Sequence, residues 1–199
     1  SKKATTRKVF GTWQAALPKK LGTPSITWEY RGADGTVVSV VARWDQADGG
    51  KEIRPVTAAP GGGWVAEAPP VPRPIYNLPE VVKASRVVVV EGEKCAAALV
   101  SLGITATTSS QGASSAATAD WTPLAGKHIV MLPDHDEAGE DYARDVAQLA
   151  AEAAVEAVAL HAHSIAERED EIGIEGQARG ALAGHGIVDD DHIGRDAHA

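Results

Sequence analysis

Cysteine is almost absent from this chain of 199 residues, which contains Cys95 alone. A single cysteine excludes an internal disulfide and any zinc site built from several thiolates, and it fits a reducing compartment. No apolar stretch approaches the roughly 20 residues of a membrane-spanning helix, and no apolar run follows the basic start to make a signal peptide. We therefore expect a cytoplasmic protein with no membrane partner.

Periodic glycine is also lacking, because the 20 Gly and 11 Pro follow no repeat and so exclude a collagen-like chain. The net charge of -8 is unevenly spread: residues 1–90 carry 13 Lys and Arg against 7 Asp and Glu, whereas residues 91–199 carry 6 against 20. A basic half suits phosphate contacts, and an acidic half repels phosphates unless a divalent cation intervenes. Two solvated surfaces explain the same charges, so charge alone leaves both interpretations open.

The first half of the sequence predicts a small β-rich subdomain. Residues 1–24 are expected to form a basic arm or linker, and residues 25–84 the β-rich subdomain with a Pro-rich connector. Ile26–Tyr30 and Thr36–Trp44 are β-type runs on either side of an Asp-Gly turn, which is a hairpin signal. The connector is expected to be extended because proline restricts itself and the residue before it; its prolines are Pro69, Pro70, Pro72 and Pro74.

The second half alternates apolar strands with helices, which predicts a parallel sheet with right-handed crossovers. The expected strands are Arg86–Glu91, Ile104–Thr108, His128–Leu132 and Val155–Leu160, and the expected helices are Lys94–Leu102 and Ala138–Ala154. The fold class is therefore α/β, with a Rossmann-like four-stranded parallel sheet over residues 85–162 behind the small β-rich subdomain. Residues 163–199 are expected to be an acidic, partly disordered extension.

Carboxylates follow two of these strands, where a parallel sheet places its binding site. Glu91 comes directly after the first strand, and Asp134 and Asp136 follow the third. Residues two apart in an extended segment point the same way, so the two aspartates can face one ion. Three carboxylates in close reach repel one another unless a cation neutralises them, and hard oxygen ligands suit Mg²⁺ or Mn²⁺. The pattern predicts a site for phosphoryl-transfer chemistry.

The two acidic motifs resemble a known domain family. Glu91-Gly92-Glu93-Lys94 after one strand, and Asp134-x-Asp136-x-x-Gly139 after another, resemble the TOPRIM domain over roughly residues 85–161. The chain looks most like the bacterial-type primase-like proteins of phages, prophages and plasmids, in which a small β-rich segment comes first. The resemblance implies that Glu91 serves as general base or metal ligand and that Asp134 and Asp136 hold the Mg²⁺.

The same resemblance implies a metal-dependent nucleotidyltransferase that makes RNA primers. Its expected partners are a single-stranded DNA template, ribonucleoside triphosphates and a replicative helicase. Two departures weaken the match: Cys95 stands where the family often has an acidic residue, and no clear acidic motif follows the expected fourth strand. These departures put the metal affinity in doubt.

Further candidate residues surround these motifs. Lys94, Gln111 and Gly112 are candidate nucleotide-binding residues, because small residues and a lysine let a phosphate approach the backbone. The candidate nucleic-acid-binding residues are basic side chains of the β-rich segment and connector, namely Arg43, Lys51, Arg54 and Arg73. The tryptophans interleaved with them, Trp28, Trp44 and Trp64, either stack on bases or fill the core. Cys95 is expected to be a small buried residue.

Two other functions remain open. A metal-dependent nuclease of the OLD type would use the same carboxylates, with added acidic ligands from Glu167–Glu175. A DNA-binding replication adaptor with a degenerate TOPRIM site is the non-enzymatic alternative. Incubation with single-stranded DNA and nucleotides separates the three functions by extension, degradation or binding alone.

Overall fold

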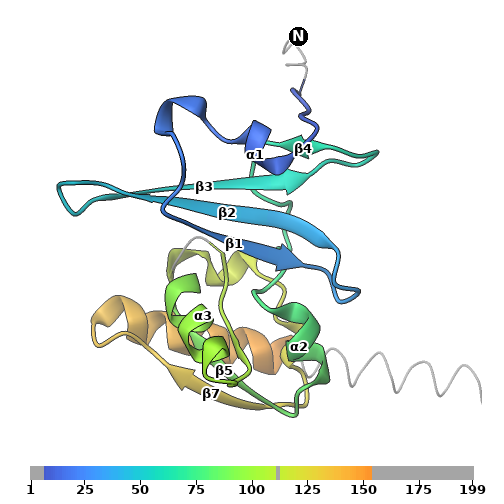
Figure 1. Cartoon of the computed structure of the whole chain (residues 1–199). Coiled ribbons are helices and arrows are strands. Elements are labelled where there is room, and N and C mark those ends of the chain that lie inside the picture. The colour runs from blue at the N-terminus through green and yellow to red at the C-terminus, as the bar shows by residue number, and fades with distance from the viewer. Residues whose placement is uncertain (1–6, 111–112, 154–199) are drawn as a thin grey trace, which may run out of the picture. The chain divides into compact units, whose positions relative to one another are not determined.

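The computed structural model describes residues 7–110 and 113–153. The chain divides into two units, Ser1–Ala157 and Val158–Ala199, and every described residue belongs to the first. That unit contains an antiparallel sheet of order β1-β2-β3-β4 and a parallel sheet of order β6-β5-β7 (Figure 1). None of the helices among the described residues is both long and apolar enough to cross a membrane.

The antiparallel sheet comes from the first half of the chain, as the turn signals predict. Its strands are β1 (Ile26–Arg31), β2 (Val37–Asp45), β3 (Lys51–Ala58) and β4 (Trp64–Val65), preceded by helix α1 (Trp13–Ala16) and the short helix η1 (Lys19–Leu21). The Asp-Gly turn joins β1 to β2: the Asp34 carboxylate accepts a 2.9 Å hydrogen bond from the Thr36 backbone N–H, and Gly35 has a φ of 84°. A positive φ is readily adopted by glycine, so the predicted hairpin is confirmed.

Both faces of this sheet are covered, because alternate residues of a strand point to opposite sides. One face packs with α1 and forms a core of buried residues: Ala16, Leu17, Val40, Ala42, Trp44 and Val56. The other face carries Trp28, Tyr30 and Val41, which pack with partly buried residues that include Tyr76 and Ala97 from the second half of the chain. Trp28 and Trp44 are buried and Trp64 is half-buried against the first core, so the structure favours the core interpretation of the tryptophans.

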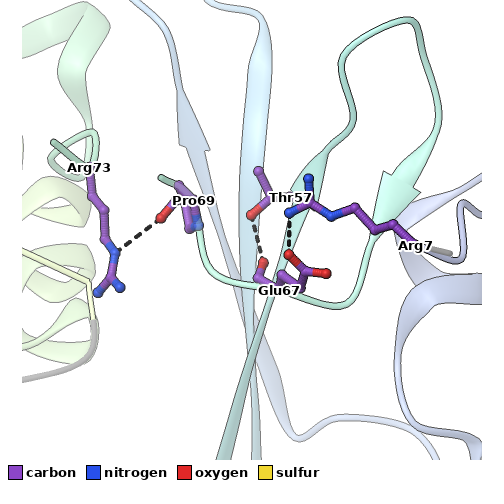
Figure 2. Close-up of polar contacts among 5 residues, drawn as sticks. All are labelled: Arg7, Thr57, Glu67, Pro69 and Arg73. Carbon is purple, nitrogen blue, oxygen red and sulfur yellow. Dashed lines mark hydrogen bonds and ion pairs between the residues drawn. The ribbon is translucent and has the colours of Figure 1, made fainter. Parts of the chain in front are cut away.

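The connector between the sheets is anchored by polar contacts at both ends (Figure 2). The Thr57 hydroxyl donates a 2.7 Å hydrogen bond to the Glu67 carbonyl, and the Arg7 guanidinium forms an ion pair with the Glu67 carboxylate. The Arg73 guanidinium donates to the Pro69 carbonyl at 3.2 Å. These bonds satisfy backbone groups that have no strand partner.

The second half forms the parallel sheet with helices around it. Its elements are α2 (Leu78–Lys83), β5 (Arg86–Val90), α3 (Glu93–Ser101), β6 (Ala106–Thr107), η2 (Ala113–Thr118), η3 (Thr122–Leu124) and β7 (His128–Leu132), and a further helix spans 137–153. Strand β5 lies between β6 and β7 and is parallel to both. The expected parallel α/β arrangement is confirmed for three strands, and the fourth, expected at Val155–Leu160, lies outside the described residues.

The core of this half explains why β5 is a continuous run of valines. Val87 and Val89 are fully buried on one side of the strand, and they pack in a cluster with Val81, Tyr142 and Val146. Strand β5 therefore has helical segments against it as well as a strand on each edge. A central strand covered in this way favours unbroken apolar sequence over alternation. Its end, and the site that follows it, is held in place by the core.

Candidate functional site

The ends of strands β5 and β7 lie side by side. In the parallel register, Val90 pairs with Leu132, so the last residues of both strands are level. Glu91 follows Val90 directly, and Asp134 stands two residues after Leu132. The two acidic motifs therefore follow neighbouring strands, which the sequence argument needed but could not establish. Loops at this edge of a parallel sheet are the usual position of a binding site.

A cleft of about 580 Å³ opens at this edge. Its walls come from both sheets: Trp28, Arg43, Lys51, Ile53, Arg54 and Pro55 from β1 to β3, and Glu91, Gly92, Glu93, Lys94, Cys95 and Asp134 from the parallel sheet and its loops. Basic side chains therefore share the cleft with carboxylates. This pairing of charges suits a ligand that carries phosphates together with a cation that offsets the acids.

Glu91 lies within the electrostatic field of both aspartates. Burial raises the pKa of the Glu91 carboxyl, Asp134 and then Asp136 raise it further, and Lys51 opposes the shift. One carboxylate oxygen, Oε2, is buried without a hydrogen-bond partner. A buried carboxylate oxygen without a donor is costly, and a cation or a proton removes that cost.

The three acids do not form a ready-made three-ligand metal cluster. Within residues 7–110 and 113–153, no group of three or more His, Cys, Asp or Glu side chains could hold a metal ion. The tight convergence expected from the sequence is therefore not met, because Asp134 and Asp136 lie on an exposed loop beyond the strand end. Mg²⁺ is nevertheless commonly held by one or two carboxylates plus waters and substrate phosphates. The unpartnered Glu91 oxygen beside two aspartates fits that kind of hydrated ion.

Asp136 also has a structural task. Its Oδ1 accepts a 2.8 Å hydrogen bond from the backbone N–H of Gly139, which caps the start of the helix spanning 137–153. A Cβ atom at Gly139 would lie 2.4 Å from the Asp134 carbonyl oxygen and 2.7 Å from its nitrogen. Glycine is required there because the Asp134 backbone folds back onto the first helical turn. The spacing Asp-x-Asp-x-x-Gly thus has a geometric reason apart from metal binding.

The cleft brings together most of the predicted basic residues. Arg43, Lys51, Arg54 and Lys94 line it. Arg43 also donates a 2.7 Å hydrogen bond to Asp45, which holds the guanidinium near the end of β2. Arg73 is not among the lining residues, because its guanidinium bonds to the connector and, at 3.4 Å, to the Thr118 hydroxyl. The remaining candidates, Gln111 and Gly112, lie outside the described residues.

Comparison with protein families matches residues 88–171 to a family described as Toprim-like. This part of the chain is a Toprim-like domain. The match covers both acidic motifs, the last residues of β5, and strands β6 and β7. The Toprim-like domain therefore contributes the acidic wall of the cleft, formed by Glu91, Glu93 and Asp134. No curated protein matches the chain.

Two solved structures from bacteriophage T7 resemble the chain at 19% identity. One is the primase fragment of the primase-helicase protein, with a TM-score of 0.44 over 62% of this chain and 48% of that chain. The other is a complex of the lagging-strand DNA polymerase with primase domains bound to an RNA/DNA hybrid and dTTP, with a TM-score of 0.41 over 62% and 59%. The chain therefore spans about half the length of these two proteins.

Glu93 is a functional candidate that the sequence analysis underestimated. The sequence analysis names Glu93 only as part of the first acidic motif, but Glu93 is 7% exposed and its Oε1 accepts a 2.9 Å hydrogen bond from the Tyr30 hydroxyl. Burial raises the pKa of Glu93, against the opposing effects of its own backbone N–H, Tyr30, Lys51 and Arg43. The pKa of Tyr30 lies well above its usual range, chiefly because of burial and then because of the Glu93 charge. The alternation of Trp28 and Tyr30 on one strand could indicate that Tyr30 is buried. It could not identify Glu93 as the partner of Tyr30, because the two are 63 residues apart in the sequence.

Cys95 corrects another expectation. The thiol is exposed and lines the cleft, whereas the sequence analysis placed it among buried alanines. The buried residues of α3 are Glu93 and Ala96, so Cys95 lies outside the buried face of the helix. The Cys95 thiol is therefore open to ligand and solvent.

Proposed function

We propose that this chain is a primase-like nucleotidyltransferase that joins ribonucleotides into short RNA primers on single-stranded DNA, with Mg²⁺ or Mn²⁺, in phage, prophage or plasmid replication. The observation that carries the proposal is the cleft in which Arg43, Lys51 and Arg54 share the space above Glu91 and Asp134. Its acidic wall belongs to the Toprim-like domain. A basic surface beside oxygen ligands is the arrangement that template-directed phosphoryl transfer requires.

The basic wall of the cleft is formed by Arg43, Lys51 and Arg54. We assign it to the phosphates of the nucleic acid and the nucleotides. Lys51 and Arg54 are exposed on β3, so neither loses a core contact on reaching a phosphate backbone, but the Arg54 guanidinium has to leave its ion pair with the Glu52 carboxylate. Lys94 is exposed at the start of α3, whereas Ala96, two residues further along the helix, is buried. We assign Lys94 to the incoming triphosphate. The tryptophans contribute walls and core instead of stacking platforms, because Trp28 and Trp44 are buried.

Glu91 is assigned the proton transfer. Its raised pKa and its unpartnered Oε2 make it a better proton acceptor than an exposed carboxylate, which suits removal of a proton from the attacking hydroxyl. Glu91, Asp134 and the second carboxylate oxygen of Asp136 are the residues that would hold the divalent cation. That ion would supply charge neutralisation of the phosphates.

The test is an incubation of the chain with single-stranded DNA, labelled ribonucleoside triphosphates and Mg²⁺ or Mn²⁺. New oligoribonucleotides support the proposal, and shortened DNA supports the nuclease alternative. The key variant is Asp134→Ala with Asp136→Ala, which should lose all product. Lys83→Ala is the matched control, because Lys83 is an exposed residue of α2 that pairs with Glu80 and does not line the cleft. Full activity in the double variant would remove both aspartates from the mechanism.

The DNA-binding adaptor is the second candidate, and two observations favour it. No three-ligand metal cluster is assembled in the part of the chain that the structure describes. Cys95 stands where the resemblance leads us to expect an acidic residue. An adaptor would bind single-stranded DNA through the basic wall and yield neither longer nor shorter strands. The acidic stretch 167–175, which the nuclease alternative needs, lies outside the described residues. A replicative helicase is the partner that we propose for either function.

A further inference from the structure

Tyr30 and Glu93 connect the antiparallel sheet to the Toprim-like domain. Tyr30 is 1% exposed on β1, and Glu93 begins α3, two residues after Glu91. Their hydrogen bond of 2.9 Å lies beside an apolar contact in which Trp28, Tyr30 and Val41 pack against residues that include Ala97 of α3. A directional polar bond within apolar packing selects one arrangement of the two surfaces, because any other leaves a buried carboxylate without its donor.

The ring of Tyr30 is itself held in position. It meets the ring of Tyr76 edge to face, with centroids 5.8 Å apart and an interplanar angle of 72°. Tyr76 is anchored in turn by two bonds: its backbone N–H donates to the Thr108 carbonyl at 3.0 Å, and its carbonyl accepts from the Thr107 hydroxyl at 2.6 Å. The hydroxyl of Tyr30 is thus aimed at Glu93 by contacts on more than one side.

The register of the sheet carries this constraint to the basic wall. Tyr30 and Trp28 are two apart on β1 and share a face, and Trp28 lines the cleft. Val41, opposite Trp28, and Arg43, opposite Ile26, are alternate residues of β2 on that same face. Lys51 and Ile53 continue the face on β3. A shift of Tyr30 relative to α3 would therefore move Arg43 and Lys51 relative to Glu91.

We propose that Glu93 is a positioning residue, which acts through Tyr30 to hold the basic wall of the cleft opposite Glu91. The catalytic consequence rests on the proposed function, whereas the structural link does not. Glu93 in this role binds no metal, because its Oε1 is occupied by the Tyr30 hydroxyl and the residue, although it lines the cleft, is only 7% exposed. An acceptor oxygen at residue 93 is the property that matters, and its negative charge is not.

The first test measures the position of the basic wall without any need for activity. Cys95 is the sole cysteine and is exposed, and Ala47 is exposed in the turn between β2 and β3, so Ala47→Cys in the full chain gives a pair of sites for spin labels. We expect a narrow label-to-label distance distribution in this parent. Tyr30→Phe and Glu93→Ala should broaden or shift it, whereas Glu93→Gln should keep it, because the amide oxygen still accepts from the hydroxyl. A distribution in Tyr30→Phe identical to the parent would overturn the proposal.

The second test compares primer synthesis in the unlabelled chain with its native Ala47. Tyr30→Phe and Glu93→Ala should lower kcat/KM by about tenfold through misplacement of the basic wall, and Glu93→Gln should stay near the parent. The Mg²⁺ concentration for half-maximal rate should not change in any of the three. If Glu93→Gln abolishes turnover while the distances stay narrow, Glu93 acts at the reacting groups and the proposal is wrong.

The two tests separate the possible failures. If the parent makes no primers, the proposed function fails, and the distance distributions alone decide whether Tyr30 and Glu93 set the position. Thermal melts followed by circular dichroism accompany each variant, because Glu93→Ala leaves a cavity and a donor without an acceptor. If Glu93→Ala does not fold, Tyr30→Phe and Glu93→Gln still form the decisive pair, since both keep nearly the native volume.

Discussion

The Tyr30 hydroxyl donates a hydrogen bond to the Glu93 carboxylate across an interface between residues that are 63 positions apart. Both side chains are buried. The Glu93 charge is one cause of the high pKa of Tyr30, after burial, whereas the hydrogen bond from Tyr30 lowers the pKa of Glu93 against the larger effect of burial. The bond couples the β-rich half of the chain to the helix that follows Glu91. Its removal is therefore expected to change both stability and its dependence on pH.

The first prediction concerns stability at alkaline pH. Because the pKa of Tyr30 in the folded chain is raised above its ordinary value of 10.0, folded Tyr30 keeps its proton where the unfolded chain loses it. The stability that this residue contributes is thus fully present below pH 10 and falls as the pH rises above it. Tyr30→Phe should be less stable than the parent by about 1–3 kcal/mol near neutrality, because it leaves a buried acceptor unpaired.

Urea denaturation of the parent and Tyr30→Phe at neutral pH and above pH 10 checks this expectation. The difference in the free energy of unfolding should shrink as the pH rises, since Tyr30→Phe has no proton to lose at that position. The other tyrosines are present in both proteins and cancel in the comparison. A difference that grows with pH would contradict the assigned direction of the Tyr30 pKa.

The second prediction concerns Gly139. Alanine in the middle of a helix normally improves stability over glycine by about 1 kcal/mol, but here its Cβ would lie 2.4 Å from the Asp134 carbonyl oxygen. Overpacking of this kind costs about 1–3 kcal/mol, so we expect Gly139→Ala to lower the melting temperature and to reduce primer synthesis by displacing Asp134. Gly11→Ala is the control, because a Cβ there meets no atom within 4 Å. Equal melting temperatures for the two variants would show that the Asp134 backbone can move away from the added Cβ at little cost, contrary to this prediction.

The third prediction separates the two tasks of Asp136. Asn is as good a helix cap as Asp, so Asp136→Asn should keep the stability of the chain while losing the charge needed for a cation. Asp136→Ala should lose the cap as well, at a cost of about 1 kcal/mol. We expect both to be inactive, with only Asp136→Ala melting at a lower temperature. Retained activity in Asp136→Asn would assign this residue to capping alone.

The fourth prediction concerns metal binding by Glu91 and Asp134. Without metal, Glu91→Gln should raise stability above the pH at which Glu91 ionises, because it removes a buried charge that the aspartates repel. Mg²⁺ at about 100 times its dissociation constant should stabilise the parent by about 2.7 kcal/mol, and should stabilise Glu91→Gln and Asp134→Asn much less. Melting curves with and without Mg²⁺ measure both effects. An equal Mg²⁺ response in all three proteins would exclude these carboxylates as ligands.

The fifth prediction concerns the basic wall. Lys51→Ala and Arg54→Ala should weaken binding of a labelled single-stranded oligonucleotide, and each should reduce the slope of log affinity against log salt by about 0.7 if one phosphate contact is lost. Lys83→Ala should leave both quantities unchanged, because its side chain is outside the cleft. Fluorescence anisotropy at several salt concentrations provides the measurement. A slope unaffected by Lys51→Ala would remove β3 from the template path.

The strands and the acidic motifs could be predicted from the sequence because both depend on local pattern. A run of valines indicates a central parallel strand, the Asp-Gly turn indicates a hairpin, and the carboxylates mark the strand ends. The order β6-β5-β7, which places β5 beside β7, could not be predicted, because the crossover rule fixes the handedness of a connection and not which strands become neighbours. The environment of Cys95 could not be predicted in this way, because one helical step separates an exposed position from a buried one.

The sequence by itself determined which elements form and that Glu91, Asp134 and Asp136 follow strands of a parallel sheet, since hydrophobic period and turn chemistry act over a few residues. Only the tertiary structure decided that Trp28 and Trp44 are core residues, that Arg73 anchors the connector, and that Glu93 is buried against Tyr30. These outcomes depend on which distant surfaces meet. The free energy of packing those surfaces together comes from the apolar area that they bury and the hydrogen bonds that they form. No short stretch of sequence contains either.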